Sequence, residues 1–372
     1  MRMNRKEERL RVLFLAPLHP RVGGVAEVSQ SLLDSDLQNE FDIQAINLSK
    51  NRSERERTFT VNPASFFFAA YSWLRLVTRL TVFRPNVLYI ASSYDWSYLR
   101  NVVLMFTAKL FGAKVVCHFH GRRSGALFSS SSRNARWLGR FTSKSFNRII
   151  FLSPGLKESF VPIFGAEKAE VVPNFVEPGH FRLSSGLTAR EARAIFVGRL
   201  SDDKGIYEFL ESMALLRRDG RPLRVDILGV AETEEDERSV REFAARFGLA
   251  QALIFHGFKT GQEKADLLGQ ATVFVLPSKL EIFPITVLEA YASGLPVVAS
   301  RVGALAEIIN EGENGFLVRP GNAGELAECL RLILDDEPLR RKMAAVNRQT
   351  VETQYSKNLS VCKVAEIFRS LR

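Results

Sequence analysis

Short runs of apolar residues alternate with longer stretches of helical spacing along most of the chain. In the first half the apolar runs cover residues 11–16, 87–90, 115–119 and 149–152, and a helix is expected from Val25 to about Leu37. Uninterrupted apolar strands joined by helices are typical of a parallel sheet that is buried on both faces. The pattern therefore predicts an α/β fold for this half.

The same alternation starts again near residue 192. Its apolar runs cover residues 194–197, 223–228, 253–256, 273–276 and 296–299, and the segment 177–190, with Pro, Gly and Ser, is the best linker candidate. A chain of 372 residues is long enough for two domains. We expect doubly wound domains over residues 1–182 and 183–355 that face each other across a cleft, and a last helix over 356–372. Ligands of such sheets bind at the carboxyl ends of the strands.

The composition is that of a globular protein, with 46% hydrophobic and 25% charged residues. No apolar run is long enough to span a bilayer, and the N-terminus lacks the features of a signal peptide. Cys117, Cys329 and Cys362 are far apart and have no metal-ligand spacing, which favours reduced thiols in the cytoplasm.

The net charge of +10 is concentrated in the first half. Residues 1–180 contain 25 Lys and Arg against 14 Asp and Glu, whereas the rest of the chain contains 26 against 27. This asymmetry indicates an anionic partner for the first half: a membrane surface, a phosphorylated acceptor or nucleic acid. Nucleic acid is the weakest of the three, because no strand has the interleaved aromatic residues of an RNA-binding sheet.

The segment 64–84 combines aromatic and basic residues. It contains Phe66-Phe67-Phe68 and Trp73 together with Arg75, Arg79 and Arg84. This composition fits a helix bound at a membrane surface, and it also fits a crossover helix that packs on the sheet. The sequence leaves both interpretations open.

Two glutamates stand eight positions apart, Glu281 and Glu289. The residues after Pro284, from about Thr286, read as a helix start, so Glu281 precedes the helix and Glu289 lies inside it. The free N–H groups at a helix start suit a phosphate, and the carboxylates suit sugar or ribose hydroxyls. The alternative is a capped amphipathic helix with a surface glutamate.

Two further loops follow strands and open helices. Gly23-Gly24 would let the backbone approach a ligand closely, although the spacing is not that of a nicotinamide or flavin fingerprint and a tight turn is the alternative. Arg199 and Lys204 offer a forked donor and a point charge that suit a diphosphate. The alternative interpretation is that Arg199 and Lys204 are ordinary charges on a solvated loop.

Three other motifs have simpler interpretations. His118 and His120 lie on one side of a strand; we expect His120 to be a hydrogen-bonding residue at the sheet edge and His118 to be structural, because a metal would need a third ligand. Asp34-Ser35-Asp36 reads as a solvated face late in a helix. The serine-rich stretch 129–132, flanked by Arg122, Arg123, Arg133 and Arg136, is either a mobile acceptor loop or an ordinary one.

Taken together, these motifs resemble the GT4-type retaining glycosyltransferases, whose GT-B fold has two Rossmann-like domains and a C-terminal helix that returns toward the first domain. In the second half the resemblance is carried by Leu276-Pro277-Ser278, the glutamate pair, residues 289–300, Val302-Gly303 and Asn314-Gly315. In the first half it is carried by Gly23-Gly24, His120-Gly121 and Val172-Pro173-Asn174.

The resemblance implies a role for each motif. Glu289 would hold the ribose, Glu281 and His120 would face the donor sugar, and the backbone near Gly24, Ile285 and Thr286 would bind phosphate. The implied catalytic residues are His120, Arg199, Lys204 and Glu281. The implied donor-binding residues are Gly23, Gly24, Arg199, Lys204, Phe283, Ile285, Thr286 and Glu289.

The expected activity is retaining transfer of a sugar from a nucleoside diphosphate sugar to a glycan or lipid-linked acceptor, without a metal or cofactor, in polysaccharide or glycolipid biosynthesis. The enzyme would be cytoplasmic and, through its basic half, peripheral on the inner membrane face. Ile282, Phe175 and Pro284 depart from the common residues of the family. The alternatives are a nucleotide-sugar epimerase or phosphorylase of the same fold, and a non-catalytic basic binding protein.

Overall fold

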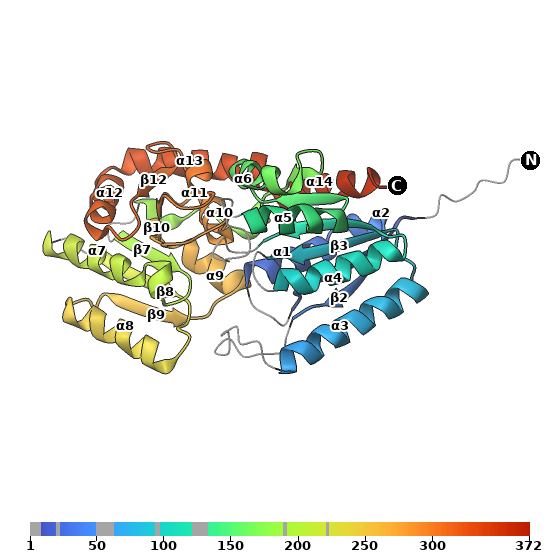
Figure 1. The fold of residues 1–372 in the computed structure, drawn as a ribbon. Helices are drawn as coiled ribbons and strands as arrows, with labels where there is room; N and C mark the ends of the chain where they lie inside the picture. Colours follow the sequence, from blue (N-terminus) through green and yellow to red (C-terminus); the bar gives the residue numbers. More distant parts are fainter. Residues whose placement is uncertain are drawn as a thin grey trace, which may run out of the picture. The chain divides into compact units, whose positions relative to one another are not determined.

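The chain folds into two compact units, each built on a parallel sheet (Figure 1). The computed structural model describes residues 9–19, 23–49, 63–93, 97–120, 133–188, 192–220 and 223–372. The first unit comprises Met1–Pro173 and Asn358–Arg372, and the second comprises Asn174–Lys357. The boundary proposed after residue 182 therefore falls inside the second unit.

The first unit contains a six-stranded parallel sheet with the strand order β2-β1-β3-β4-β5-β6. Four of these strands were predicted. The other two lie at the edges of the sheet: β2 is largely polar, with only Ile46 fully buried, and β6 has three residues. The strands are β1 Arg11–Ala16, β2 Asp42–Asn47, β3 Val87–Ser92, β4 Lys114–Phe119, β5 Arg148–Phe151 and β6 Ala169–Val171.

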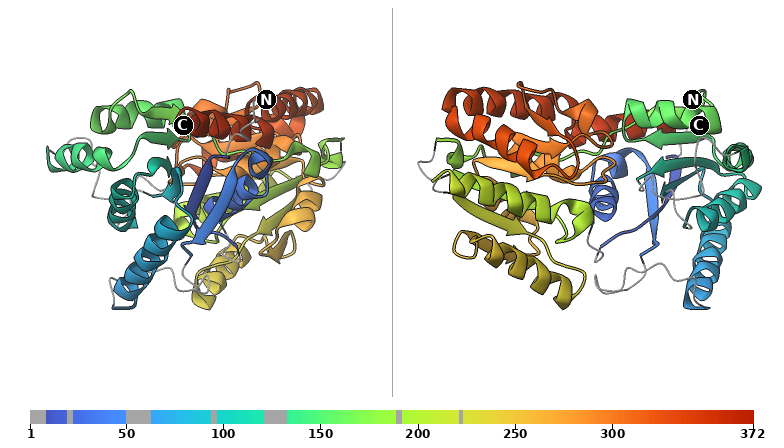
Figure 2. Two further views of the ribbon diagram at one scale, coloured as in Figure 1. Left: turned by 90° about the vertical axis from the view of Figure 1, so that its right-hand side faces the viewer. Right: turned by 60° about the vertical axis from the view of Figure 1, so that its left-hand side comes forward.

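Most helices of this unit lie on one face of the sheet. The crossover from β1 to β2 runs in the opposite direction to the later crossovers, so the right-handed rule places α3, α4 and α5 together on the face away from α1. Figure 2 shows these three helices side by side. The helices are α1 Gly24–Leu33, α2 Leu37–Glu40, α3 Pro63–Val82, α4 Ser97–Leu110, α5 Arg133–Thr142, α6 Pro154–Phe164 and α14 Lys357–Arg369.

Helix α1 ends four residues earlier than the sequence predicted. Asp34 accepts hydrogen bonds from the Gln30 amide at 3.0 and 3.1 Å, and the Ser35 hydroxyl donates to the Leu32 carbonyl at 2.6 Å. The Ser35 bond to a backbone carbonyl competes with the helical ladder, whereas the Gln30–Asp34 bond only joins two side chains one turn apart. Asp34-Ser35-Asp36 therefore forms the turn between α1 and α2 and is not a helix face.

Helix α14 completes the core of the first unit, as the expected fold requires. The Phe368 ring lies 5.5 Å from Phe41, 6.0 Å from Phe14 and 6.1 Å from Tyr89, measured between ring centroids. One residue further on, Arg369 donates two hydrogen bonds of 2.6 Å to the Glu40 carboxylate. The end of the chain is thus joined to its first hundred residues.

The second unit contains another six-stranded parallel sheet, with the order β12-β11-β10-β7-β8-β9. The sequence missed only β12, a four-residue edge strand. Its strands are β7 Ala192–Val197, β8 Leu223–Leu228, β9 Leu253–Gly257, β10 Val273–Leu276, β11 Val297–Ser300 and β12 Gly315–Val318. Its helices are α7 Ile206–Arg218, α8 Glu234–Arg246, α9 Gly261–Leu268, α10 Ile285–Ala292, α11 Leu305–Ile308, α12 Ala323–Asp335 and α13 Glu337–Gln354.

The segment 177–190, predicted to be a linker, is packed on the second unit over its described residues, 177–188. Arg340 of α13 donates to the Leu187 carbonyl at 2.8 Å, and Ser185 donates from its backbone N–H to the Gly269 carbonyl at 3.0 Å. A Cβ at Gly186 would lie 2.3 Å from the Ala271 carbonyl oxygen, so only glycine fits there. The linker prediction was wrong because this polar segment is held through its backbone.

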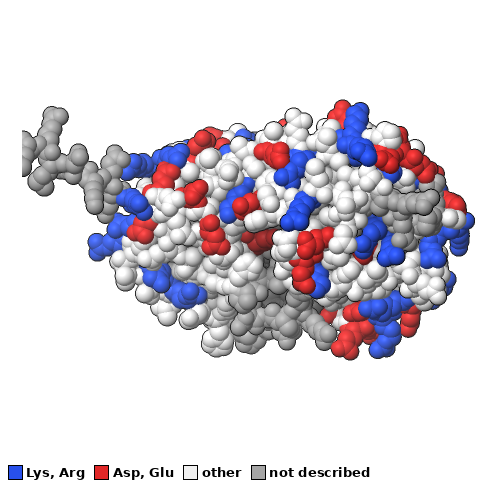
Figure 3. All heavy atoms as spheres, turned by 180° about the vertical axis from the view of Figure 1, so that it is seen from behind, with Lys and Arg blue, Asp and Glu red and all other residues white. Residues whose placement is uncertain are grey.

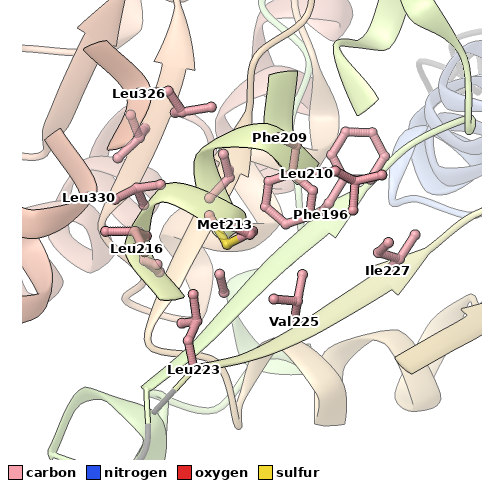
Figure 4. Packing of buried hydrophobic residues seen from close by; sticks show 14 of the residues in the cluster. Phe196, Phe209, Leu210, Met213, Leu216, Leu223, Val225, Ile227, Leu326 and Leu330 are labelled. Carbon is pink, nitrogen blue, oxygen red and sulfur yellow. The ribbon is translucent and has the colours of Figure 1, made fainter. Parts of the chain in front are cut away.

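One large core holds the second unit together. Helices α7 and α12 pack on one face of the sheet, and Phe209, Leu210 and Met213 of α7 meet Phe196 of β7 (Figure 4). Leu330 of α12 belongs to the same buried cluster. This packing fixes the start of α7 against the carboxyl end of β7. No helix among the described residues is long and apolar enough to cross a membrane.

We predict that Phe368→Ala lowers the free energy of unfolding of the first unit by about 3–5 kcal/mol, because it leaves a cavity among three rings. Differential scanning calorimetry or chemical denaturation would measure this loss. Phe258→Ala, at a residue of the second unit that is 43% exposed, is the control and should change stability by about 0.5 kcal/mol or less. Equal effects of the two substitutions would contradict the role assigned to α14.

Candidate active site

Two loops of the second unit meet where the strand order of its sheet reverses. From the neighbouring strands β7 and β10, later strands are added outward in opposite directions. The loops that follow both strands emerge at the carboxyl edge of the sheet, which is the position where open α/β sheets bind ligands. Arg199 and Lys204 follow β7, and Glu281 follows β10.

An ion pair connects these two loops. Lys204 lies at the end of a short 3-10 turn, Asp202–Lys204, and its ammonium group pairs with the Glu281 carboxylate. The hydroxyl of the buried Ser278 donates to the same carboxylate oxygen at 3.0 Å. The Glu281 side chain is only 10% exposed, so its orientation is fixed from two sides. Two residues predicted independently for one site are therefore in contact.

Two glycines, one in the loop after β7 and one in the loop after β11, allow these loops to approach the loop that contains Glu281. A Cβ at Gly205 would lie 2.0 Å from the Pro277 carbonyl oxygen, and a Cβ at Gly303 would lie 2.2 Å from the Glu281 carbonyl oxygen. Both residues have positive φ angles, 73° and 53°, which favour glycine. Any other residue would strain the backbone and push the Glu281 loop away.

Helix α10 starts directly after the Glu281 loop, as predicted. Ile285 and Thr286 form its first turn, and no side chain caps it. The loop is held by Asn174, which donates to the Phe283 carbonyl at 2.8 Å. The Phe283 ring is buried and lies 5.8 Å from the Tyr355 ring, so this side chain has a packing role whatever else it does.

Glu289 is buried in the middle of α10. It is 2% exposed, which rules out the alternative of a surface glutamate. Its carboxylate pairs with Lys264 of α9, which is itself 7% exposed. Sequence reasoning missed Lys264, although this lysine takes a buried position together with Ala265 and Leu268 in an otherwise ordinary helix. Glu289 thus lies in the interior of the second unit, where its charge is compensated by Lys264.

Arg199 has two acidic partners in the second unit. Its guanidinium donates to Asp203 at 3.2 Å and also pairs with Glu232, from the loop between β8 and α8. Neither carboxylate was among the predicted residues. Glu232 could not be predicted, because only the fold brings it to this loop. The cation is therefore not simply solvated, and its position is set by two anions.

In the first unit, Gly23 and Gly24 form the start of α1, as expected for a turn after β1. The Gly23 carbonyl accepts from the N–H groups of Ala26 and Glu27 at 3.0 and 3.1 Å, and its φ angle of 139° requires glycine. Pro20, Arg21 and Val22 lie outside the described residues. The turn is confirmed, and its contact with a ligand stays a prediction.

The two histidines differ in environment. His118 is buried, and its Nδ1 lies 2.7 Å from the Tyr89 hydroxyl. Burial, and secondarily the neighbouring His120, lowers the pKa of His118 well below its ordinary value. His120 is partly exposed at the end of β4, where its backbone N–H donates to the Ser92 carbonyl at 2.8 Å. His118 is therefore part of the core, as predicted.

Comparison with known proteins gives the family. Residues 22–180 match the model described as Glycosyltransferase Family 4, and residues 181–350 match the one described as Glycosyl transferases group 1. An uncharacterized glycosyltransferase of Methanocaldococcus jannaschii is 26% identical over 360 residues, which cover 90% of this chain and 91% of that protein. The chain belongs to the GT4-type glycosyltransferases.

Solved structures show the same fold for this glycosyltransferase. Sucrose-phosphate synthase from Thermosynechococcus elongatus aligns with a TM-score of 0.80 and 17% identity, over 98% of this chain and 99% of that one. HepE of Anabaena, solved in complex with UDP, aligns with a TM-score of 0.74 and 18% identity, over 97% and 100%. The GT-B architecture predicted from the sequence is confirmed.

The residues that depart from the family pattern are packed inside the glycosyltransferase. Ile282 and Phe175 are 8% and 5% exposed, and the Ile282 carbonyl accepts from the Ala304 N–H at 2.8 Å. Pro284 is the N-cap of α10. The side chains at all three positions are therefore buried.

The described residues contain no cluster of three or more His, Cys, Asp or Glu side chains that could hold a metal ion. The three cysteines are free thiols, and burial raises the pKa of Cys117. The arginines at 122 and 123 and the serine-rich stretch 129–132 lie outside the described residues, as do the side chains of Arg133 and Arg136.

We predict that the glycosyltransferase loses stability as the pH falls below the ordinary histidine pKa of 6.5. The unfolded chain then binds a proton that folded His118 does not, so the free energy of unfolding should fall by up to about 1.4 kcal/mol per pH unit. Unfolding curves between roughly pH 7.5 and 5.5 would measure the slope. His118→Gln should reduce this slope, whereas His180→Gln, at an exposed histidine, should leave it unchanged. Equal slopes in the wild type and both variants would contradict the assignment of the pH dependence to His118.

Proposed function

We propose that this glycosyltransferase moves a sugar from a nucleoside diphosphate sugar to a glycan or lipid-linked acceptor, with retention of configuration at the anomeric carbon. The observation that supports the proposal best is the Lys204–Glu281 pair across the β7 and β10 loops, next to the uncapped start of α10. A cation, an oriented carboxylate and free backbone N–H groups are the groups that a diphosphate joined to a polyol requires.

The diphosphate is proposed to lie against Arg199, Lys204 and the first turn of α10. The bond between the anomeric carbon and the phosphate oxygen breaks, and negative charge develops on that oxygen. Fixed cations and N–H groups stabilise this charge without reorganisation, and no metal is needed for it. The acidic partners Asp203, Glu232 and Glu281 hold the two cations in position before the donor binds.

The acceptor oxygen then forms the new bond to the anomeric carbon on the same face of the sugar. Its proton passes to the departing phosphate oxygen, so the reaction balances without a separate base. Glu281 would accept hydrogen bonds from donor-sugar hydroxyls, because Lys204 and Ser278 orient its carboxylate. His120 of the first unit is proposed to contact the same sugar.

The nucleotide end of the donor is assigned to Glu289. A buried carboxylate is costly unless it is paired and hydrogen-bonded, and Lys264 supplies the pair. A carboxylate has up to four acceptor sites, so Glu289 can also accept from both ribose hydroxyls. The backbone at Gly23 and Gly24 and the Phe283 loop are the remaining donor-binding elements we propose.

We predict that UDP, GDP or ADP, alone or as its sugar conjugate, raises the melting temperature of the full chain. Ligand at 100 times its Kd stabilises the native state by about 2.7 kcal/mol. A thermal-shift screen of the three nucleotides and their sugars would identify the base. If no nucleotide or nucleotide sugar raises the melting temperature and no sugar is transferred to added acceptors, the proposed function is wrong.

We predict that Glu289→Gln and Lys204→Met each weaken binding of that nucleotide sugar about 10- to 100-fold, since each removes a charge-assisted hydrogen bond worth about 1.5–3 kcal/mol. Isothermal titration calorimetry would measure the affinity. Glu337→Gln and Arg341→Met, in an exposed pair on α13, are the matched controls and should bind normally.

Unchanged affinity in Glu289→Gln and Lys204→Met would show that the donor binds elsewhere. Lys264→Met tests the buried ion pair separately from the donor-binding group, because it removes the ammonium group that pairs with Glu289 and leaves the carboxylate. We expect this variant to be less stable without ligand, by up to about 3–5 kcal/mol, because one member of a buried ion pair is lost.

A further inference from the structure

Helix α3 has two different apolar faces. Ser72, Leu76 and Leu80 are buried against the first unit, as in a crossover helix. On the opposite side, Phe67 and Leu74 are 72% and 58% exposed and lie seven residues apart, two turns along one stripe. The crossover interpretation of this segment is therefore correct, yet it leaves a second row of large apolar side chains without a core.

The exposed apolar residues continue onto the helices beside α3. Trp73 donates from its indole N–H to Thr107 of α4 at 3.1 Å, and Tyr98 of α4 donates to Thr142 of α5 at 2.8 Å, so the three helices are neighbours. Val103 on α4 is 56% exposed and Trp137 on α5 is 69% exposed. Soluble proteins rarely gather so many exposed aromatic and aliphatic side chains on one layer.

The same layer contains no acidic residue. Helices α3, α4 and α5 have no Asp or Glu, and residues 57–157 contain 15 Lys and Arg against the single Asp95. On the view in Figure 3, acidic and basic side chains are instead interspersed over much of the surface. A face that combines exposed aromatic rings with one sign of charge is complementary to a surface that is both apolar and anionic.

The layer ends at a basic cavity. Where α3 and α4 lead into β3 and β4, a cavity of about 680 Å³ is lined by Arg9, Arg11, Arg84 and Lys114 among others, with no acidic side chain. The exposed Phe111 also lines it. This edge of the sheet is opposite to the carboxyl edge where Gly23 and His120 lie, so the cavity is not part of the candidate active site.

We propose that the outer face of α3, α4 and α5 docks the enzyme on an anionic lipid bilayer. The aromatic and aliphatic side chains enter the region between headgroups and acyl chains, while the surrounding lysines and arginines attract the lipid phosphates. No spanning segment is required for this mode of binding. The proposal goes beyond sugar transfer and does not depend on it, because lipid binding is measured without donor or acceptor.

The test is co-sedimentation of the full chain with vesicles of phosphatidylcholine alone and of phosphatidylcholine mixed with phosphatidylglycerol, at low and high salt. We expect binding to the mixed vesicles only, at low salt, with a blue shift of tryptophan fluorescence as Trp73 and Trp137 leave water. No binding to anionic vesicles at low salt, or no blue shift on binding, would overturn the proposal.

Two variants probe the apolar and basic contributions. The apolar variant is the triple substitution Phe66→Ser/Phe67→Ser/Leu74→Ser, and the basic variant is the double substitution Lys114→Glu/Arg140→Glu. Each variant should reduce the partition coefficient into anionic vesicles at least about tenfold. Their controls are Ile254→Ser/Leu332→Ser and Arg218→Glu/Lys342→Glu, which make the same kinds of change at exposed positions of the second unit.

The outcomes are distinguishable. Loss of lipid binding in both test variants and normal binding in both controls would support the docking face. Equal losses in test and control variants would overturn it, because net charge or hydrophobicity alone would then decide binding. Binding to heparin or RNA that is unaffected by the serine substitutions, with no vesicle binding, would instead mark the layer as a site for soluble polyanions.

Discussion

The close approach of Gly205 to the Pro277 carbonyl is the constraint on which the site depends. It lets the loop after β7 lie against the loop after β10, and only then can Lys204 reach Glu281. The core of β7 and α7 holds one side of this contact, and Asn174 holds the other by fixing the Phe283 carbonyl. A few backbone distances thus convert two ordinary sheet loops into a single charged surface.

Charge compensation is the common theme of the site. Arg199, Lys204 and Lys264 each have a carboxylate partner in the structure described here. Pairing reduces the cost of keeping partly buried charges in fixed positions, although it gives little net stability by itself. An incoming diphosphate would therefore find cations whose side-chain freedom has already been lost, which lowers the entropic cost of binding.

The parts of this architecture that could be predicted from the sequence are those that depend on residues close together in the chain. Buried strands appear as apolar runs, and the helix start after Pro284 fixed the relation between Glu281 and Glu289. Polar or very short edge strands such as β2 and β12 lack that signal. Glu232 and Lys264 could not be assigned either, because their partners are 33 and 25 residues away and only the fold brings them together.

The return of α14 to the first unit has a consequence for the order of folding. Phe368 packs on Phe14 and Tyr89 across almost the whole chain, whereas every contact within the second unit joins residues between 174 and 357. During synthesis the second unit can close as soon as its own residues have emerged. The first unit, although it is made earlier, must wait for the last helix with part of its aromatic core uncovered. Contacts this distant in sequence are slow to form, so the half that is translated first is the half that matures last.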